Sequence, residues 1–355
     1  MGRSQEQTLM VTITDVAAHA GVGAGTVSRV LNDSPRVSAQ TRARVLASIA
    51  QLDYRPNPTA RALSRGRCET VGIVVPFFTH ASAVERLRGV ADALHGSDYD
   101  LVLFNVESPV HRDEHFETLS RRGRIDGLMI ISLPPTPHHV ARLVRNNVHI
   151  VLVDARAPGV TAVVTDDVHG GRIATRHLVD LGHRRIAYMG DFVDSPLGFT
   201  SSAQREEGYR QVLAETGITF APELVRHGAH ERSVARALTD EFLSLPSRPT
   251  AVFAASDVQA LGVIEAARAH GLVVPDDLSV IGFDDVEIAA YAGLTTVRQP
   301  LFASGRRGAE LLLDAIRGDD ARTGLDIELP LELTVRTTTC PPRPDDGGRS
   351  KPEGG

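Results

Sequence analysis

Residues 14–32 read TDVAAHAGVGAGTVSRVLN, and this stretch decides the fold of the N-terminal part of the chain. Val16 and Ala20 share one face of a first short helix, and Gly21 stands where a glycine commonly ends a helix. A second helix is expected from about Ala24 to Leu31, because its apolar residues recur at helical spacing. Two short helices joined by a three-residue turn are typical of the helix-turn-helix motif.

A third helix is expected to complete this small domain. Ser38 is a favourable N-cap for it, as Thr14 is for the first helix. The apolar stripe of the third helix is expected to consist of Val45, Leu46, Ile49 and Leu52. The three helices together predict an all-α headpiece.

Charge is distributed unevenly along the chain. The formal net charge of all 355 residues is −6, yet residues 1–67 contain nine arginines and only four carboxylates. A basic segment attached to an acidic body is typical of a nucleic-acid-binding arm. The sequence shows no signal peptide and no apolar run long enough to span a membrane, so we expect a cytoplasmic, nucleoid-associated protein.

The stretch TITDVAAHAGVGAGTVSRVLN, together with the later TRARVLASIAQLDYRPNPTARALSRGR, resembles the headpiece of the lactose-repressor (LacI/GalR) family of bacterial transcription regulators. The resemblance implies that the second helix enters the major groove of operator DNA. It implies base contacts by Ala24, Gly25 and Arg29, backbone contacts by Thr26 and Ser28, and further DNA contacts by Thr14, Asn32, Tyr54 and Asn57. Ala24 and Gly25 offer bases no hydrogen-bonding side chain, so direct readout is expected from Arg29, whose guanidinium suits guanine.

Residues 56–67, PNPTARALSRGR, are too short and too polar to form a stable helix alone. The resemblance implies that this segment becomes a hinge helix when two protomers meet on the operator, and that the pair enters the minor groove. By position, Leu63 would wedge between base pairs, Ala60 would pack against the partner hinge, and Arg61 would lie near the DNA backbone.

From Thr70 onward, continuous apolar strands alternate with amphipathic helices, from TVGIVVP to LSVIGFDD. Such strands are typical of parallel sheets covered on both faces, and a second series that starts after AVVTDD predicts two similar α/β lobes. This part of the chain resembles the effector domain of the same family, which has the fold of periplasmic sugar-binding proteins. The stretches that carry the resemblance are DGLMIIS, HLVDLGHRRIAYMGD, AQREEGYR, ASDVQALG, VIGFDD and LTTVRQP. The resemblance implies two parallel sheets and three crossings between lobes, near residues 165–167, 295–299 and 324–329.

The same resemblance places a small-molecule effector between the lobes, at the carboxyl ends of the strands. By position, Arg205 would grip the effector and Asp284 would accept hydrogen bonds from it. Further candidates for effector contacts are Asp154, Asp257, Ser201, Phe78 and Phe283, the two rings offering the flat apolar surface that a sugar needs. A sugar is the expected effector; a nucleobase, a nucleoside or another metabolite acting as corepressor is the alternative.

Two other classes of function fit the sequence less well. An enzyme is not expected, because the sequence holds no nucleophile elbow, P-loop or dinucleotide-binding loop, and no catalytic residue, cofactor or metal site is predicted. A solute-binding transport protein remains a remote alternative, since it would need export and would have no use for a basic helix-turn-helix arm. The interpretation is a homodimeric repressor that binds a pseudo-palindromic operator and has no membrane partner.

The expected domain limits are a disordered N-terminus at 1–10, a headpiece at 11–56, a hinge at 57–68, an effector-binding and dimerisation domain at 69–341, and a disordered tail at 342–355. Within the body, the first lobe is expected at about 69–165 and 298–326 and the second at about 166–297 and 327–341.

Overall fold

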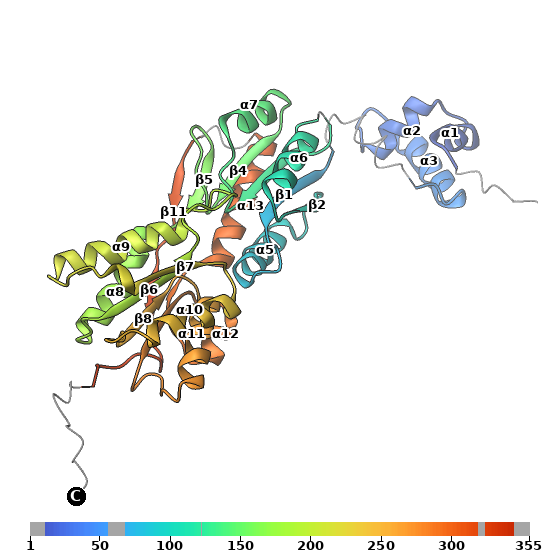
Figure 1. Cartoon of the computed structure of the whole chain (residues 1–355). Coiled ribbons are helices and arrows are strands. Elements are labelled where there is room, and N and C mark those ends of the chain that lie inside the picture. The colour runs from blue at the N-terminus through green and yellow to red at the C-terminus, as the bar shows by residue number, and fades with distance from the viewer. Residues whose placement is uncertain (1–10, 56–67, 122, 319–323, 344–355) are drawn as a thin grey trace, which may run out of the picture. The chain divides into compact units, whose positions relative to one another are not determined.

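The structure is a computed structural model that describes residues 11–55, 68–121, 123–318 and 324–343. The chain divides into two compact units, Met1–Cys68 and Glu69–Gly355 (Figure 1). The first unit holds the helices of the headpiece, and the second holds both sheets of the body.

The headpiece consists of three helices, as expected: α1 (Ile13–Ala20), α2 (Ala24–Leu31) and α3 (Ala39–Gln51). Val16, Val27 and Val45 come one from each helix and are fully buried in a common core. Gly21 follows α1 with φ of 61°, a left-handed conformation that glycine adopts without the steric cost of a side chain. This turn separates α1 from α2 and produces the predicted helix-turn-helix.

Two details of the headpiece differ from the prediction. Thr12, and not Thr14, caps α1: its hydroxyl accepts from the Asp15 amide at 3.4 Å, while the Asp15 carboxylate accepts from the Thr12 amide at 2.8 Å. This capping box starts the helix early and leaves Thr14 exposed within its first turn. Leu46 was expected in the core but is 50% exposed, because α3 buries the face that carries Val45 and Ser48.

The body contains two sheets of six strands each. The first has the order β11-β5-β4-β3-β1-β2 and consists of β1 (Thr70–Pro76), β2 (Asp100–Val106), β3 (Gly127–Ile131), β4 (His149–Val153), β5 (Thr161–Val164) and β11 (Asp326–Glu328). The second has the order β12-β10-β9-β8-β6-β7 and consists of β6 (Ile186–Asp191), β7 (Val225–Gly228), β8 (Ala251–Ala254), β9 (Ser279–Asp284), β10 (Thr295–Arg298) and β12 (Glu332–Thr334). All pairs are parallel except β10 with β12, so the predicted fold class is confirmed.

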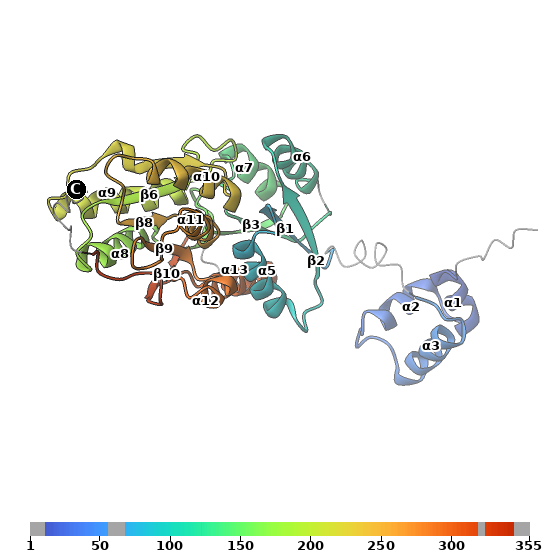
Figure 2. The same cartoon turned by 60° about the horizontal axis from the view of Figure 1, so that its bottom comes forward.

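Helices cover both faces of each sheet (Figure 2). In the first lobe these are α5 (Ala81–Leu94), α6 (Pro109–Leu119), α7 (Pro137–Arg145) and α13 (Leu301–Arg317). In the second lobe they are α8 (Asp167–Asp180), α9 (Ser201–Glu215), α10 (Arg232–Leu243), α11 (Asp257–Ala269) and the short α12 (Glu287–Tyr291), with the single turn η1 (Pro222–Leu224). Alternate residues of β1 show the two-sided burial, since Ile73 and Val75 face one core and Val74 faces the other.

Helix α13 was absent from the elements expected from sequence, although it is the longest helix in the described part of the chain. It follows β10 of the second sheet and returns to pack against α5, β3 and β4 of the first lobe. The two helices touch through their backbones: a Cβ atom at Gly305 would lie 1.9 Å from the Arg86 carbonyl oxygen, and one at Gly89 would lie 2.0 Å from that of Phe302. Glycine is therefore required at both positions.

The chain crosses between the sheets after β5, after β10 and between β11 and β12. The third crossing falls at residues 329–331, because Asp326–Glu328 pair with β5 in the first sheet. The expected lobe limits at 298 and 326 each lie within a strand: Arg298 still belongs to the second sheet, and the first lobe extends through Glu328.

Candidate functional sites: a reading helix and an inter-lobe cleft

Helix α2 begins with residues that have small side chains or none. Ala24, Gly25 and Arg29 are exposed, while Thr26 and Ser28 are half-buried. A Cβ atom at Gly23 or Gly25 would meet no atom within 4 Å, and neither residue has positive φ. The fold of the headpiece therefore does not require these glycines, although Gly25 weakens the helix by about 1 kcal/mol relative to alanine. No contact within the described headpiece depends on their small size.

The remaining headpiece candidates lie in different settings. Thr14 is exposed on α1, Asn32 follows α2 as its C-cap, and Tyr54 is half-buried against the headpiece core. Asn57, Ala60, Arg61 and Leu63 lie outside the residues that the structure describes, as does most of the expected hinge.

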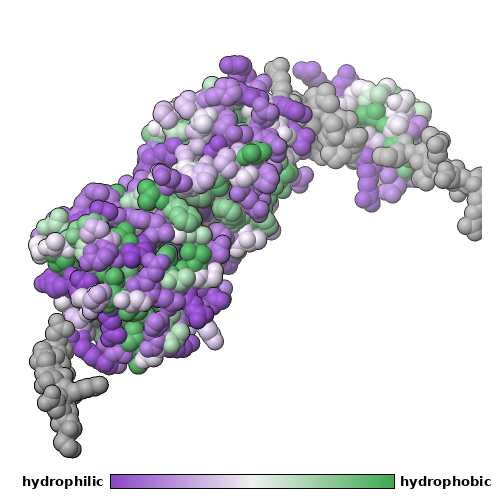
Figure 3. All heavy atoms as spheres, viewed as in Figure 1, coloured by the Kyte–Doolittle hydropathy of each residue, from purple (hydrophilic) through white to green (hydrophobic). Residues whose placement is uncertain are grey.

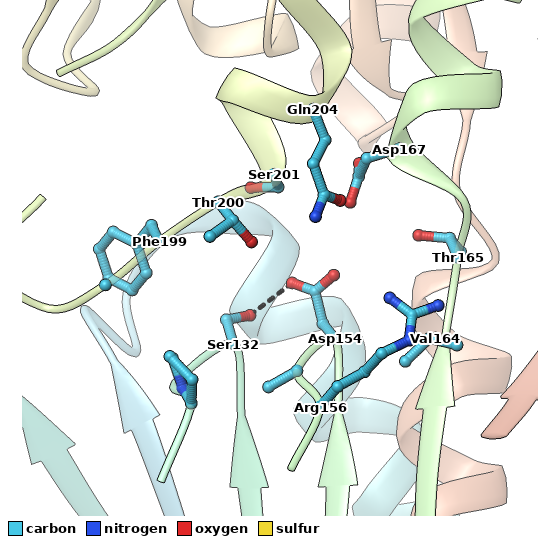
Figure 4. A pocket seen from close by; sticks show the side chains of 13 residues that line it. Ser132, Asp154, Arg156, Val164, Thr165, Asp167, Phe199, Thr200, Ser201 and Gln204 are labelled. Carbon is cyan, nitrogen blue, oxygen red and sulfur yellow. Dashed lines mark hydrogen bonds between the residues drawn. The ribbon is translucent and has the colours of Figure 1, made fainter. Parts of the chain in front are cut away.

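A cavity of about 390 Å³ lies between the two lobes of the body. Its walls come from the carboxyl ends of β1, β4, β6, β7 and β9 and from helices α5 and α9. A second chamber of about 230 Å³ adjoins it and shares Ser132, Asp154, Phe199 and Ser201 with it. Figure 4 shows Ser132 and Asp154 at the ends of first-lobe strands, with Ser201 and Gln204 of α9 on the opposite side of this chamber. The cleft therefore lies where open α/β sheets bind ligands.

Arg205, at the start of α9, is 6% exposed and held on three sides. Its Nε donates to Asp167 Oδ1 at 2.8 Å, its Nη1 donates to the carbonyl oxygen of Ala255 at 2.5 Å, and its guanidinium carbon lies 3.7 Å from the centre of the Phe283 ring. Burial raises the pKa of Asp167 to about 6, against the opposing effect of the Arg205 charge. These contacts fix the plane of the guanidinium before any ligand arrives.

Asp284 ends β9 and lines the cleft 3.9 Å from Arg205 Nη1. Its Oδ1 accepts from Gln299 Nε2 at 2.6 Å, and its backbone has φ of 114°. Burial raises the pKa of Asp284, although Arg205 and His230 counteract that effect. Asp154 lines the cleft from the first lobe, where its Oδ2 accepts from the Ser132 hydroxyl at 2.6 Å. Ser201 lies on the opposite wall.

Three candidates lie elsewhere than expected. Asp257 is fully buried beneath β9, and its oxygens accept from the Thr296 hydroxyl at 2.6 Å and the Val286 amide at 3.0 Å, so it supports the sheet and does not line the cleft. Phe283 lies in the core under Arg205. Phe78 is exposed away from the cleft, because its neighbour Phe77, with φ of 43°, turns into it instead.

Several cleft residues were missed by sequence reasoning: His80, Arg86, Asp191, His230 and Gln299. Asp191 ends strand β6 and His230 follows strand β7, so the rule that located Asp154 and Asp284 could have found them. The sequence around Arg86 did not indicate a cleft residue, because an arginine on an amphipathic helix is ordinarily solvent-exposed.

The part of the chain that the structure describes holds no group of three or more His, Cys, Asp or Glu side chains suited to a metal ion. No described helix combines the length and apolarity needed to cross a membrane. On the face shown in Figure 3, hydrophilic residues predominate over the body and hydrophobic ones form small separate patches.

Each of the two units matches a known protein family. The profile of "Bacterial regulatory proteins, lacI family" matches residues 12–57, and that of "Periplasmic binding protein-like domain" matches residues 175–339. Catabolite control protein A of Priestia megaterium is 31% identical over 333 residues, which cover 93% of this chain and 99% of that protein. The lac repressor dimer bound to operator and the anti-inducer ONPF has a TM-score of 0.80 at 28% identity, over 93% of this chain and 99% of that one. The complex of the transcriptional regulator CelR with cellobiose has a TM-score of 0.69 at 32% identity, over 92% and 99% of the two chains.

Proposed function

This chain belongs to the lacI family of bacterial regulatory proteins, so it is a DNA-binding transcriptional repressor under the control of a small-molecule effector, and we propose that the effector is an uncharged sugar held between Arg205 and Asp284. The proposal rests on one observation: the buried guanidinium of Arg205 and the buried carboxylate of Asp284 line the same inter-lobe cavity of about 390 Å³. That volume lies within the usual range of small-molecule sites.

The chemistry of the cleft suits hydroxyl groups. Arg205 presents a planar fork that can donate to two neighbouring hydroxyl oxygens, while Asp284 and Asp154 can accept from hydroxyl hydrogens. Phe77 and Phe199 supply apolar ring faces for the C–H surface of a sugar. CelR, which shares the fold, has been solved with cellobiose. The stacked rings of Phe77, His80 and His230 would also suit a planar nucleobase, which is the second candidate.

At the operator, Arg29 would read guanine through two hydrogen bonds, while Ala24 and Gly25 allow α2 to approach the base edges closely. Thr26 and Ser28 would contact phosphates, as would Thr14, Asn32 and Tyr54. In the hinge, Leu63 would open a base step at the operator centre, with Ala60 against the partner hinge and Arg61 and Asn57 near the DNA backbone.

The operator requires two headpieces, and an exposed apolar groove of about 530 Å³ on the body is suited to the contact between two copies of the chain. Ala81 and Val84 of α5 and Ile288 and Tyr291 of α12 line this groove, and Tyr291 is 89% exposed. An exposed aromatic residue in an apolar groove is typical of a protein interface. Tyr291→Asp should convert a dimer into a monomer in light scattering, whereas Val110→Asp, exposed on α6, should not.

The protein would act in the cytoplasm, on DNA of the nucleoid, and would catalyse no reaction. The test is fluorescence anisotropy with a palindromic DNA from upstream of its own gene, at about 50 mM and about 200 mM salt, where affinity should fall steeply as salt rises. A parallel thermal-shift screen would use D-glucose, D-ribose, cellobiose and hypoxanthine, because a binder stabilises the native state. A stabilising compound should also change operator affinity, and Arg205→Ala should abolish both effects. If Arg205→Ala responded like the wild type, the effector site would lie elsewhere.

A further inference from the structure

We propose that Arg86 of α5 is a second effector-binding arginine, which faces the cleft from the lobe opposite Arg205 and donates a hydrogen bond from Nε to an uncharged oxygen of the effector. The inference rests on the proposed function, since it assigns a further contact within the same cleft. Nothing in the helical pattern around Arg86 suggested this role.

The first support is an unpaired donor. Arg86 is 4% exposed and lines the cavity. Its Nη2 lies 3.2 Å from Asp154 Oδ2 and donates to Gln299 Oε1 at 3.3 Å. Among the buried side-chain nitrogen and oxygen atoms that the structure describes, only Arg86 Nε and Arg185 Nε have no hydrogen-bond partner. Arg185 precedes β6, at the end of the sheet away from the cleft.

The second support is rigidity. A buried N–H without an acceptor destabilises the folded state, so an arginine retained in this state calls for a partner. The backbone of Arg86 is fixed, because its carbonyl oxygen lies against Gly305 in the contact between α5 and α13. Asp154 and Gln299 hold Nη2 of the guanidinium, and the buried Nε donor beside it has no partner.

The third support is the charge around the site. Asp154 already offers Arg86 a counter-charge, and Asp167 and Asp284 offer Arg205 two. No positive charge is left over for a phosphate or carboxylate of the effector. The acceptor for Arg86 Nε is therefore a hydroxyl, ring or carbonyl oxygen.

The contacts also join the two arginines. Gln299 accepts from Arg86 through Oε1 and donates to Asp284 through Nε2, and Asp284 lies 3.9 Å from Arg205. Gln299 stands directly after β10, where the chain crosses from the second lobe to the first. An effector held by both arginines would connect the lobes next to this crossing.

A different explanation of the unpaired Nε is a water molecule. A small cavity of about 10 Å³ lies beside Arg86, Asp154 and Gln299, which is close to the smallest space that holds one water. In that case Arg86 would serve only the fold, and its replacement would change stability without changing effector affinity.

The experiment compares Arg86→Met, Arg86→Lys and the control Arg88→Met, a neighbour on α5 that is exposed and paired with Glu85. Each variant would be titrated with D-glucose, D-ribose, cellobiose and hypoxanthine by calorimetry, and melted without additive. Both Arg86 variants should bind the stabilising compound about 10- to 100-fold more weakly than the wild type, and Arg88→Met should bind it normally.

Normal binding by Arg86→Met with an altered melting temperature would overturn the proposal and leave the effector site at Arg205 intact. Normal binding by Arg86→Lys would overturn it as well, because lysine keeps the charge and lacks the Nε donor. If none of the four compounds bound the wild type, the proposed effector class and this inference would both fail.

Discussion

His80 of the first lobe and His230 of the second stack directly on each other in the cleft, with ring centroids 5.3 Å apart and planes inclined by 22°. Phe77 also stacks on His80, with ring centroids 5.1 Å apart, and Asp191 Oδ1 lies 3.1 Å from His230 Nδ1. The two histidines are thus in different electrostatic surroundings, although their rings touch. The charge state of this pair affects the contact between the lobes.

Stability of the body should depend on pH through this pair. Burial and the neighbouring His230 lower the pKa of His80. Burial and Arg205 also act to lower the pKa of His230, but the hydrogen bond and charge of Asp191, together with the charge of Asp284, outweigh them and raise it. His230 therefore stabilises the fold below pH 6.5 and loses that contribution as pH rises through its raised pKa. His80 stabilises the fold above pH 6.5 and loses its contribution as pH falls through its lowered pKa.

The stability difference between the wild type and the double variant His80→Ala, His230→Ala should consequently be largest near pH 6.5. Urea unfolding from about pH 5 to about pH 8 would measure it. Asp191→Asn should remove the part of this pH-dependent difference in stability that comes from His230. A difference that did not vary with pH would show that the two rings act only through packing.

Replacement of Asp257 should damage the fold and leave the effector site unaltered. Asp257→Ala leaves the Thr296 hydroxyl and the Val286 amide without their acceptors, at about 1–3 kcal/mol for each buried donor. Asp257→Asn retains one acceptor oxygen and should lose less. Urea unfolding gives the free energies, and calorimetry at a temperature where both variants are folded should return wild-type effector affinity. A loss of affinity in folded Asp257→Asn would contradict this assignment.

Gly25→Ala should have opposite effects on stability and on DNA binding. The added methyl group meets nothing within 4 Å in the headpiece, and alanine favours the helix by up to about 1 kcal/mol. The melting temperature of the headpiece transition should rise, while operator affinity measured by anisotropy should fall. Ala47→Gly, at an exposed position of α3, is the control, which should lower stability without changing affinity per folded molecule. Unchanged operator affinity in Gly25→Ala would exclude close approach of DNA at this point.

Leu63→Ala should weaken operator binding by about tenfold or more and leave effector affinity unaltered, because the expected wedge acts only on DNA. Leu46→Ala, which removes an exposed leucine of α3, serves as the control. Anisotropy would measure the first quantity and calorimetry the second. Equal operator affinities of the two variants would contradict a hinge contact at the operator centre.

The sequence predicted most strands of the body, because the inner strands β1, β3, β8 and β9 are buried on both faces and read as continuous apolar runs. It located Asp154, Arg205 and Asp284 in the cleft, the aspartates at strand ends and the arginine on α9. Asp257 also follows a strand but does not line the cleft, since its side chain lies under Gly282, where a Cβ atom would come within 2.4 Å of its Oδ1.

The residues that were missed share a different property. The contacts of Arg86 with Gln299 and of His80 with His230 join segments 213 and 150 positions apart in the chain. No local pattern encodes which side chains meet after the lobes pack, so these pairs could be seen only in the structure.

The path of the chain through α13 has a consequence for the order in which the protein is made. Ala309, Leu312 and Ile316 of this helix belong to the same hydrophobic core as Ile73 and Val75 of β1, and Figure 1 shows the orange helix among the blue and green elements of the first lobe. During translation the ribosome produces β1 long before α13, and strands β6 to β10 of the second sheet are synthesised in the interval. The first lobe therefore lacks its last helix until most of the second lobe has been made. A truncated translation product that ends before Leu301 would carry the DNA-reading headpiece on a lobe with an open core, a ready target for cellular proteases.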